Sequence, residues 1–199
     1  MNIAVFCSGN GSNLQAIIDA HKNGYIKADL KLVVSDNPDS FALKRAEKAK
    51  IATLIVERKK FKSKEEFEKA ILKRLKKDKI DLIALAGYMK LFSRDFVMAY
   101  KDKILNIHPS LLPSFKGTKG IQDAFQYGVK VTGPTVHFVT EEMDRGPIIL
   151  QAPVMVREDD TEKALTEAIH REEHKIYPIV IQLFIEGRLK IEGNKVRIQ

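Results

Sequence analysis

The sequence predicts an α/β fold built on a doubly wound, mostly parallel sheet, with a C-terminal hairpin and a long kinked helix. Short apolar runs alternate with helical segments as far as residue 108, which is the pattern of a parallel sheet. A glycine-rich loop joins the first apolar run to the first helical segment. No linker or internal repeat interrupts this order, so the 199 residues are expected to form a single domain.

Five strands with helices between them are expected in the first part of the chain. The strands are the short apolar runs at residues 3–7, 30–34, 53–56, 81–86 and 104–108. A helix over residues 41–50 is expected to turn Ala42, Leu43 and Ala46 inward. The next helix is predicted to begin at Ser63, because Ser63 and Glu66 have the spacing of a capping box.

The glycine-rich loop, Ser8-Gly9-Asn10-Gly11-Ser12-Asn13, leads into a helix whose N-cap is predicted to be Ser12 or Asn13. Glycine lets the backbone approach an anion, and the N–H groups and dipole at a helix start favour negative charge. The third glycine of the dinucleotide fingerprint is replaced and no P-loop lysine follows. A single phosphate therefore fits better than a dinucleotide, and a tight turn that binds nothing is the alternative.

The strand at residues 104–108 places two polar side chains where apolar ones are expected. Period-2 alternation sends Asn106 and His108 to the same face, and Pro109 ends the strand directly after the imidazole. Ligands of open α/β sheets bind at the carboxyl ends of strands. The pair is thus a candidate site, and a buried His and Asn that only fasten a loop are the alternative.

Two loops and a hairpin supply further candidates. Residues 87–92 are apolar with little period and follow a strand, which suits either ordinary loop packing or a slot for a flat heterocycle. Residues 129–140 and 148–156 are expected to pair as a hairpin, with His137 facing the same way as Thr135. The acidic turn between them holds Asp144, which is either a turn residue or a carboxylate that reaches His108.

The last helix is expected to open at residues 159–162 and to carry one apolar stripe. The stripe comprises Leu165, Ile169, Ile176, Val180 and Leu183. Glu173 falls on this stripe, so its carboxylate requires a partner or a ligand amine unless it lies at the margin. Pro178 is expected to interrupt the helix.

Composition bounds the class of protein. The formal net charge of +8 favours anionic partners, but most basic residues lie on helix tails such as residues 73–77, without aromatic residues for base stacking. We therefore expect a solvated basic face and no nucleic-acid partner.

The single cysteine, Cys7, fits a reducing compartment and is expected to be a small buried hydrophobe. No signal peptide and no apolar run of roughly 18 residues is present, so we expect a cytoplasmic protein without a membrane partner.

These motifs together resemble the phosphoribosylglycinamide formyltransferases, folate-dependent enzymes of purine synthesis, over residues 1–189. The runs that carry the resemblance lie at residues 8–15, 85–89, 105–113, 136–139, 144–151 and 173–178. The Asn-x-His-Pro-Ser-Leu-Leu-Pro run at 106–113 alone is similar to the wider group of 10-formyltetrahydrofolate enzymes. The resemblance implies a Rossmann-like formyltransferase fold and transfer of formyl from 10-formyltetrahydrofolate, as co-substrate, to the amine of glycinamide ribonucleotide. No metal and no covalent enzyme intermediate are required.

The resemblance also implies site residues. The catalytic set is Asn106, His108 and Asp144. The residues expected to bind the ribonucleotide are Gly11, Ser12 and Asn13 at the phosphate, with His170, Arg171, Glu172 and Glu173 toward the glycinamide. Those expected to line the folate site are Lys64, Met89, Lys90, Leu91, Phe92, Asn106, Thr140, Glu141, Glu142, Met143 and Asp144. We expect the single domain to comprise a phosphate-binding half at residues 1–100, a catalytic and folate-binding half at 101–189, and a tail at 190–199.

Two departures from the family pattern and two alternatives remain. Residues 117–121 form a Lys- and Gly-rich loop where many members carry a His, and Arg145 replaces a small residue beside Asp144.

Another 10-formyltetrahydrofolate enzyme, such as a deformylase or a formyltransferase acting on another amine, is the first alternative function. A nonenzymatic nucleotide-binding module is the second. The expected assembly is a monomer or a homodimer.

Overall fold

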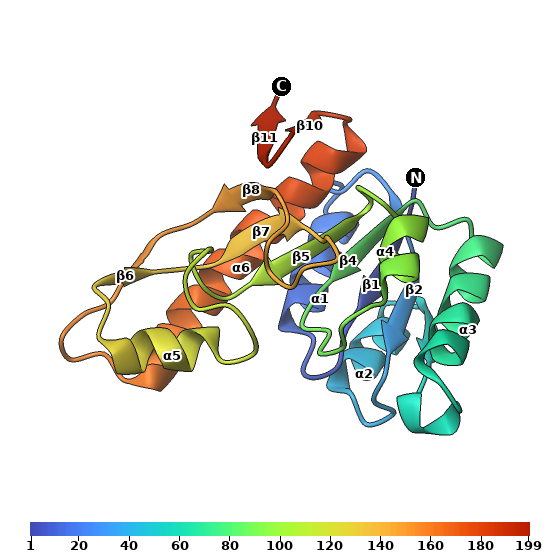
Figure 1. The fold of residues 1–199 in the computed structure, drawn as a ribbon, viewed down its shortest axis with the longest axis horizontal. Coiled ribbons are helices and arrows are strands. Elements are labelled where there is room, and N and C mark those ends of the chain that lie inside the picture. The colour runs from blue at the N-terminus through green and yellow to red at the C-terminus, as the bar shows by residue number, and fades with distance from the viewer. The chain divides into compact units, whose positions relative to one another are not determined.

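The computed structural model describes all 199 residues, which divide into two compact units, Met1–Leu105 and Asn106–Gln199. The first unit contains a parallel sheet in the order β4-β1-β2-β3 (Figure 1). Its strands are β1 (Asn2–Phe6), β2 (Asp29–Ser35), β3 (Ala52–Ile55) and β4 (Leu82–Leu85). Strands β1 and β4 are buried along nearly their whole length because their apolar side chains are covered on both faces.

The helices of the first unit alternate with its strands, as the sequence predicts. They are α1 (Ser12–Lys22), α2 (Phe41–Lys48), α3 (Lys64–Lys77) and α4 (Arg94–Ala99), with a 3₁₀ turn, η1 (Arg58–Lys60). The predicted cap of α3 is confirmed, since the Ser63 hydroxyl accepts the Glu66 N–H at 3.1 Å. In α2, Ala42 and Ala46 are buried as predicted, whereas Leu43 is only half-buried.

The second unit is organised around the strand order β5-β7-β8-β11-β10. Strand β5 (Ile104–His108) ends at the predicted residue, and β7 (Thr135–Phe138) and β8 (Ile148–Gln151) pair antiparallel as the predicted hairpin. A smaller pair, β6 (Val131–Thr132) and β9 (Val154–Met155), extends this hairpin. Helix α5 (Gly120–Tyr127) and helix α6 (Glu162–Ile185) pack together, with Leu165, Ile169 and Val154 at the core of the contact.

Helix α6 differs from the sequence prediction at Pro178. The helix runs for 24 residues and continues through Pro178, so the prediction that this proline interrupts it is wrong. Proline removes one backbone donor, but Pro178 and its neighbours Tyr177 and Val180 are buried, and this packing holds the helical turn in place. No helix, α6 included, combines the length and apolar character that a membrane span requires.

The end of the chain also differs from the predicted tail. Residues 189–198 form an antiparallel hairpin of β10 (Leu189–Glu192) and β11 (Lys195–Ile198), and β11 pairs parallel with β8 (red in Figure 1). The four-residue strands are separated by Gly193 and Asn194, and the φ of 61° at Gly193 permits this tight turn. Charged residues alternate with apolar ones in this segment, and this pattern marks a half-exposed strand.

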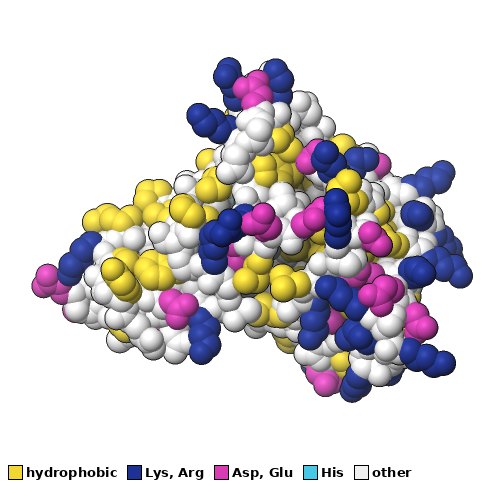
Figure 2. Space-filling model, viewed as in Figure 1, with side chains coloured by type: hydrophobic (Ala, Val, Ile, Leu, Met, Phe, Trp, Pro, Cys, Tyr) yellow, Lys and Arg dark blue, Asp and Glu magenta, His cyan; other side chains and the backbone are white.

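The distribution of charge agrees with the expected solvated face. Lys and Arg side chains are interspersed with Asp and Glu on the face shown in Figure 2 and do not gather into one stripe. In the basic run at the end of α3, Lys73, Lys76 and Lys77 are exposed, and Arg74 pairs with Asp78 at 2.6 Å.

The single cysteine, Cys7, is fully buried, and burial raises the pKa of its thiol to about 12. Cys7 therefore behaves as a small core residue.

Candidate active site

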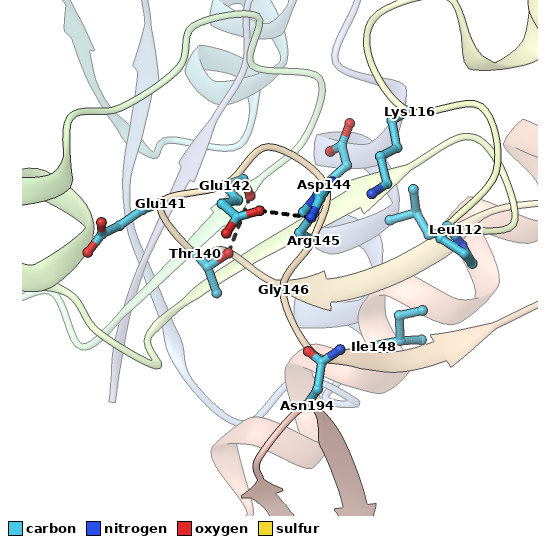
Figure 3. Close-up of a pocket in the computed structure, with 11 residues that line it drawn as sticks. Leu112, Lys116, Thr140, Glu141, Glu142, Asp144, Arg145, Gly146, Ile148 and Asn194 are labelled. Carbon is cyan, nitrogen blue, oxygen red and sulfur yellow. Dashed lines mark hydrogen bonds and ion pairs between the residues drawn. The ribbon is translucent and has the colours of Figure 1, made fainter.

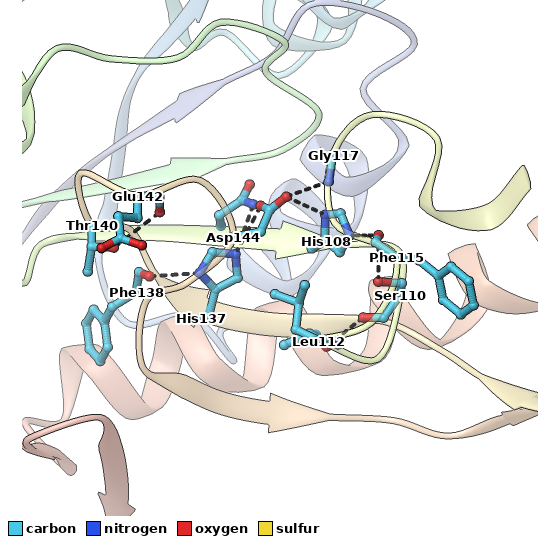
Figure 4. Close-up of polar contacts among 12 residues, drawn as sticks. His108, Ser110, Leu112, Phe115, Gly117, His137, Phe138, Thr140, Glu142 and Asp144 are labelled. Atoms are coloured by element: carbon cyan, nitrogen blue, oxygen red, sulfur yellow. Dashed lines mark hydrogen bonds and ion pairs between the residues drawn. The ribbon is translucent and has the colours of Figure 1, made fainter. Parts of the chain in front are cut away.

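The end of β5 brings Asn106 and His108 into one polar cluster in the second unit (Figure 4). His108 is only 4% exposed and Asn106 is half-buried. Pro109 follows the strand and cannot continue its hydrogen-bonding ladder, so the chain turns away directly after the imidazole. The sequence prediction that these two side chains lie together at a strand end is confirmed.

His137 on β7 is a member of this cluster that the predicted site residues did not include. Its Nδ1 lies 2.8 Å from the Phe138 carbonyl, which only accepts, so Nδ1 carries the proton. Its Nε2 then accepts from the side-chain amide of Asn106 at 3.2 Å. Burial lowers the pKa of His137 below its ordinary value, against the Phe138 hydrogen bond and Asp144, and so favours this neutral form.

Asp144 lies between the two histidines. Its Oδ2 is 3.6 Å from Nδ1 of His108, and its Oδ1 is 3.8 Å from Nε2 of His137. The backbone N–H of Gly117 donates to Oδ2 at 2.9 Å and fixes the carboxylate. The side chain is 9% exposed and the backbone adopts a left-handed φ of 52°, which aspartate tolerates better than most residues. The turn aspartate thus does reach the strand end that carries His108.

The segment after β5 completes the surroundings of His108. The Phe115 carbonyl lies 2.9 Å from Nε2 of His108, so this nitrogen donates while Nδ1 faces the carboxylate of Asp144. The hydroxyl of Ser110 donates to the same carbonyl at 3.1 Å. Both ring nitrogens of His108 therefore face hydrogen-bond acceptors.

The backbone of this segment is tied to β7. Thr135 on β7 donates to the Ser110 carbonyl at 2.6 Å and accepts the Leu112 N–H at 3.0 Å. Gln151 on β8 adds bonds to Thr135 and to the Leu112 carbonyl. Gly120, in the Lys- and Gly-rich loop that departs from the family pattern, lies so close that an added Cβ would be 3.2 Å from Nε2 of His108. A side chain at this position would crowd the imidazole.

A cavity of about 720 Å³ opens beside Asp144 (Figure 3). Of the predicted folate-site residues, Thr140, Glu141, Glu142 and Asp144 line it, whereas Met143 does not and is exposed. Lys116 and Arg145 also line the cavity. Arg145, one of the two departures from the family pattern, is paired with Glu142 at 3.2 Å. The sequence gives no indication of this pairing.

In the first unit, Gly11, Ser12 and Asn13 lie at the start of α1, but the predicted N-cap is wrong. The N-cap is Gly11, in a left-handed conformation with φ 73° and ψ 35°, and Ser12 is the first helical residue. A Cβ on Gly11 would lie 2.7 Å from the Cβ of Ala42, so only glycine fits here. Because glycine has no side chain, it cannot cap the helix as serine does. The geometry retains the strand, glycine loop and helix start of an anion site.

The other predicted residues of the first unit lie on its surface or in its aromatic packing. Met89 and Leu91 are 57% and 64% exposed, and Lys90 is 3.7 Å from the Asp36 carboxylate. The Phe92 ring instead stacks on Phe96 at 4.0 Å and on Tyr88. Lys64 lies 3.9 Å from the buried Glu68. Glu68 also accepts the Ser93 N–H at 2.8 Å and so ties α3 to the start of α4.

The four predicted residues on α6 do not share one face, because consecutive helical residues are turned by about 100°. Glu173 is buried, as its place on the apolar stripe predicts, and His170 one turn earlier is half-buried. Burial lowers the pKa of His170. Arg171 is exposed, and Glu172 pairs with Lys175 at 2.7 Å. Only His170 and Glu173 have the spacing to act together.

Comparison with known proteins identifies the family. The formyl transferase family model matches residues 1–181. Phosphoribosylglycinamide formyltransferase of Escherichia coli (strain K12) is 45% identical over 194 residues, which cover 98% of this chain and 92% of the relative. The trifunctional purine biosynthetic protein adenosine-3 of Homo sapiens is 44% identical over 96% of this chain, which spans 19% of that protein.

The solved structures agree. The crystal structure of glycinamide ribonucleotide transformylase 1 from Symbiobacterium toebii superposes with a TM-score of 0.97 at 47% sequence identity, covering 100% of this chain and 93% of that one. The predicted fold class, a mostly parallel α/β sheet with a C-terminal hairpin and a long helix, is confirmed. The chain therefore belongs to the formyl transferase family and, within it, to the phosphoribosylglycinamide formyltransferases.

Proposed function

We propose that this protein transfers the formyl group of 10-formyltetrahydrofolate to the amine of glycinamide ribonucleotide, a step of de novo purine (IMP) biosynthesis. Membership of the phosphoribosylglycinamide formyltransferases supports the activity. The observation that carries the chemistry is the cluster of Asn106, His108 and Asp144, in which His137 holds the Asn106 amide. The cluster combines hydrogen-bond donors with a group that can move a proton, as acyl transfer to an amine requires.

The reaction balances without a covalent enzyme intermediate. The amine lone pair attacks the formyl carbon, and the carbonyl electrons move to oxygen to give a tetrahedral oxyanion. The oxyanion then re-forms the carbonyl as the bond from carbon to N10 of the folate breaks. One proton leaves the attacking nitrogen and one reaches N10, so the products are the formylated ribonucleotide and tetrahydrofolate.

Asn106 is proposed as an oxyanion donor. A side-chain amide carries two N–H groups, and one of them is held by Nε2 of His137 at 3.2 Å. This bond fixes the plane of the amide, so the second N–H has a defined direction before the substrate arrives. Donors oriented in advance stabilise the charge that develops in the transition state.

His108 is proposed as the proton-transfer group, and Asp144 as its partner. The Nε2 of His108 is proposed as a second oxyanion donor when the substrate takes the place of the Phe115 carbonyl. The carboxylate 3.6 Å from Nδ1 orients the imidazole and stabilises the positive charge that the ring carries after it takes a proton from the amine. The Gly117 N–H holds the carboxylate in this position. An imidazolium provides a stronger donor to the oxyanion than a neutral ring does.

The ligand contacts are also proposals. Gly11, Ser12 and Asn13 bind the ribonucleotide phosphate, supported by the left-handed glycine at a helix start. On α6, Glu173 and His170 are proposed to contact the glycinamide side together, and Arg171 and Glu172, which face other directions, to flank it. The proposed folate residues are Lys64, 89–92, Asn106 and 140–144, and the 720 Å³ cavity beside Asp144 supports the last of these segments. Residues 1–100 then supply phosphate binding and residues 101–189 the chemistry.

We further propose a cytoplasmic location and an assembly no larger than a homodimer, with small molecules rather than nucleic acid as partners. A single, buried cysteine supports a reducing compartment. The mixture of acidic and basic side chains on the face in Figure 2, and the lack of aromatic residues in the basic run at 73–77, support small molecules as the partners. Sedimentation of the purified protein, with and without added RNA, measures both the assembly and the binding.

The central experiment measures formyl loss from 10-formyltetrahydrofolate with and without glycinamide ribonucleotide, together with mass analysis of the products. The proposal expects ribonucleotide-dependent turnover and one formylated ribonucleotide for each tetrahydrofolate formed. The variant His108→Asn, which keeps a polar side chain of similar reach, is expected to lower kcat by roughly 10²–10⁴. Its far-ultraviolet spectrum and Tm show whether the fold is retained.

The same assay separates the alternatives. A deformylase releases formate without any ribonucleotide, because water is then the acceptor. A formyltransferase for another amine leaves glycinamide ribonucleotide unchanged. A binding module takes up the ribonucleotide in calorimetry but shows no turnover with any acceptor.

A further inference from the structure

The glycine loop of the first unit is held from one side by α2 and the residue before it. The Ser40 hydroxyl donates to the Gly9 carbonyl at 2.7 Å, and the Ala42 N–H donates to the same carbonyl at 3.2 Å. The Cβ of Ala42 fills the space beside Gly11. The position of the loop is therefore set by α2 as well as by its own glycines.

Arg45, one turn further along α2, makes the most extensive side-chain contact with this loop. Its Nε donates to the Asn10 carbonyl at 3.0 Å and its Nη2 donates to Oδ1 of Asn10, also at 3.0 Å. Its Nη1 donates to Oε1 of Gln15 in α1 at 3.1 Å. One planar guanidinium thus links the residue before Gly11 to the first turns of the helix that follows.

The guanidinium itself is held in place. Its central carbon lies 4.9 Å from the centre of the Phe41 ring, within the range of a cation–π contact. The side chain of Arg45 is half-buried. An arginine that is stacked and also bonded through all three nitrogens has little rotamer freedom, so it can impose its geometry on the loop.

These contacts have an electrostatic consequence for an anion at the start of α1. The two oxygens of Asn10 carry partial negative charge and belong to the residue directly before Gly11. Arg45 binds both of them and so turns them toward α2, away from competition with an anion for the N–H groups of the helix start. Its full positive charge adds to the favourable potential of the helix dipole.

We propose that Arg45 is a positioning residue for phosphate recognition, which holds the Asn10–Gly11 backbone in its anion-binding conformation and sets the affinity for the phosphate of the ribonucleotide. The inference rests on the proposed phosphate site at Gly11–Asn13 and extends it to α2. Lysine cannot replace Arg45, because an ammonium on one flexible stem does not reproduce a three-point planar fork.

The test compares Arg45→Met and Arg45→Lys with Lys44→Met, a matched control from the neighbouring position. Lys44 is exposed, lies 5.8 Å from the same Phe41 ring, and its loss removes the same unit charge. Steady-state kinetics give the KM for each substrate and kcat separately. Arg45→Met is expected to raise the ribonucleotide KM about tenfold, the effect of losing charged hydrogen bonds. The KM for 10-formyltetrahydrofolate and kcat at saturating ribonucleotide are expected to stay within about twofold.

Three kinetic results would overturn the inference. They are an unchanged ribonucleotide KM in Arg45→Met, an equal loss in Lys44→Met, or full activity in Arg45→Lys. The second would leave only net charge as the cause, and the third would exclude the fork geometry. Melting curves of each variant show whether a loss reflects global unfolding, which would lower the apparent kcat without raising the ribonucleotide KM selectively.

A binding measurement keeps the inference separate from the proposed reaction. Calorimetry with ribose 5-phosphate and with inorganic phosphate needs no turnover. Weaker binding to Arg45→Met than to the unchanged protein and Lys44→Met supports the role of Arg45, even if formyl transfer were not observed. Failure of the unchanged protein to bind either ligand would overturn the inference directly.

Discussion

The side-chain amide of Asn106 donates to Nε2 of His137, a ring whose other nitrogen is already committed to the Phe138 carbonyl at 2.8 Å. The only ring nitrogen of His137 that can accept is therefore Nε2, and its lone pair points in one fixed direction. The orientation of the Asn106 amide follows from the protonation state of a neighbouring strand residue. This relationship makes His137 a positioning residue that acts through Asn106.

Replacing His137 is accordingly expected to reduce catalysis through Asn106. Asn106→Ala should lower kcat by roughly 10²–10³, the usual cost of one oxyanion donor, with a smaller change in the KM for 10-formyltetrahydrofolate. His137→Ala should cost less than this, because the amide remains but loses its orientation. In the double variant the effect of His137→Ala should nearly vanish. Losses that multiply would show that His137 does not act through Asn106.

The effects of replacing His108 and Asp144 should be coupled in the same way. Asp144→Ala should lower kcat, because the carboxylate 3.6 Å from Nδ1 no longer orients the imidazole, with a smaller change in the KM for 10-formyltetrahydrofolate. Adding His108→Ala should then cost much less than its single effect of roughly 10²–10⁴. A double-mutant cycle on kcat/KM measures this coupling, and independent effects would require another role for Asp144.

Gly11 tests the packing of the phosphate loop against α2. In Gly11→Ala the new Cβ would meet the Cβ of Ala42 at 2.7 Å, and the left-handed backbone alone should cost roughly 1–2 kcal/mol. Both effects should raise the ribonucleotide KM. Combining it with Ala42→Gly removes the clash but not the backbone cost, so recovery should be partial.

Ala42→Gly alone is the control for that experiment, since it has the same cost to α2, about 1 kcal/mol, but keeps glycine at position 11. Urea denaturation and the ribonucleotide KM are measured for all three variants. If adding Ala42→Gly to Gly11→Ala restored neither the stability nor the ribonucleotide KM, a clash with Ala42 would not be the cause of the loss.

The buried, neutral His137 predicts a loss of stability in mild acid. Burial lowers its pKa in the native state, while the unfolded chain has a value near 6.5. As the pH falls below about 6.5, the unfolded state binds a proton that the native state does not, so stability falls with pH. The loss is at most about 1.4 kcal/mol per pH unit until the native pKa is reached.

The measurement is the free energy of unfolding at pH 7.5 and pH 5.5, for the unchanged protein and for His137→Asn. The variant should lose less stability between the two pH values. His170, whose pKa burial also lowers, is present in both proteins and cancels in the difference. Identical losses in the two proteins would mean that His137 does not titrate in this range.

Hydrophobic periodicity and the positions of proline and helix-capping residues predicted most of the helices and strands, because these signals are local. The apolar runs give the strands, Ser63 marks the start of α3, and Pro109 marks the end of β5. The same local rules failed where tertiary packing decides. Gly11 is the N-cap of α1 because Ala42 leaves no room for a side chain, and Pro178 stays inside α6 because its neighbours are buried.

Some residues of the candidate site could likewise be predicted from the local sequence, and others could not. Asn106 and His108 could be predicted because they interrupt an apolar strand within three residues of each other. His137 was visible only as one histidine on the face of Thr135, and its contact with Asn106 depends on which strands become neighbours. The role of Arg45 depends likewise on the packing of α2 against a loop 35 residues earlier. Such long-range contacts leave no pattern in the local sequence.

The hairpin of residues 189–198 has a consequence for self-association. Strand β11 covers the edge of β8 that β7 does not occupy, and β8 is the apolar run Ile148–Gln151. An exposed apolar edge strand is a template for pairing with other chains. The outermost strand, β10, instead presents Lys190 and Glu192, charges that discourage further pairing. Deleting the hairpin should therefore yield a protein that aggregates through β8, although none of its residues belongs to the proposed catalytic set.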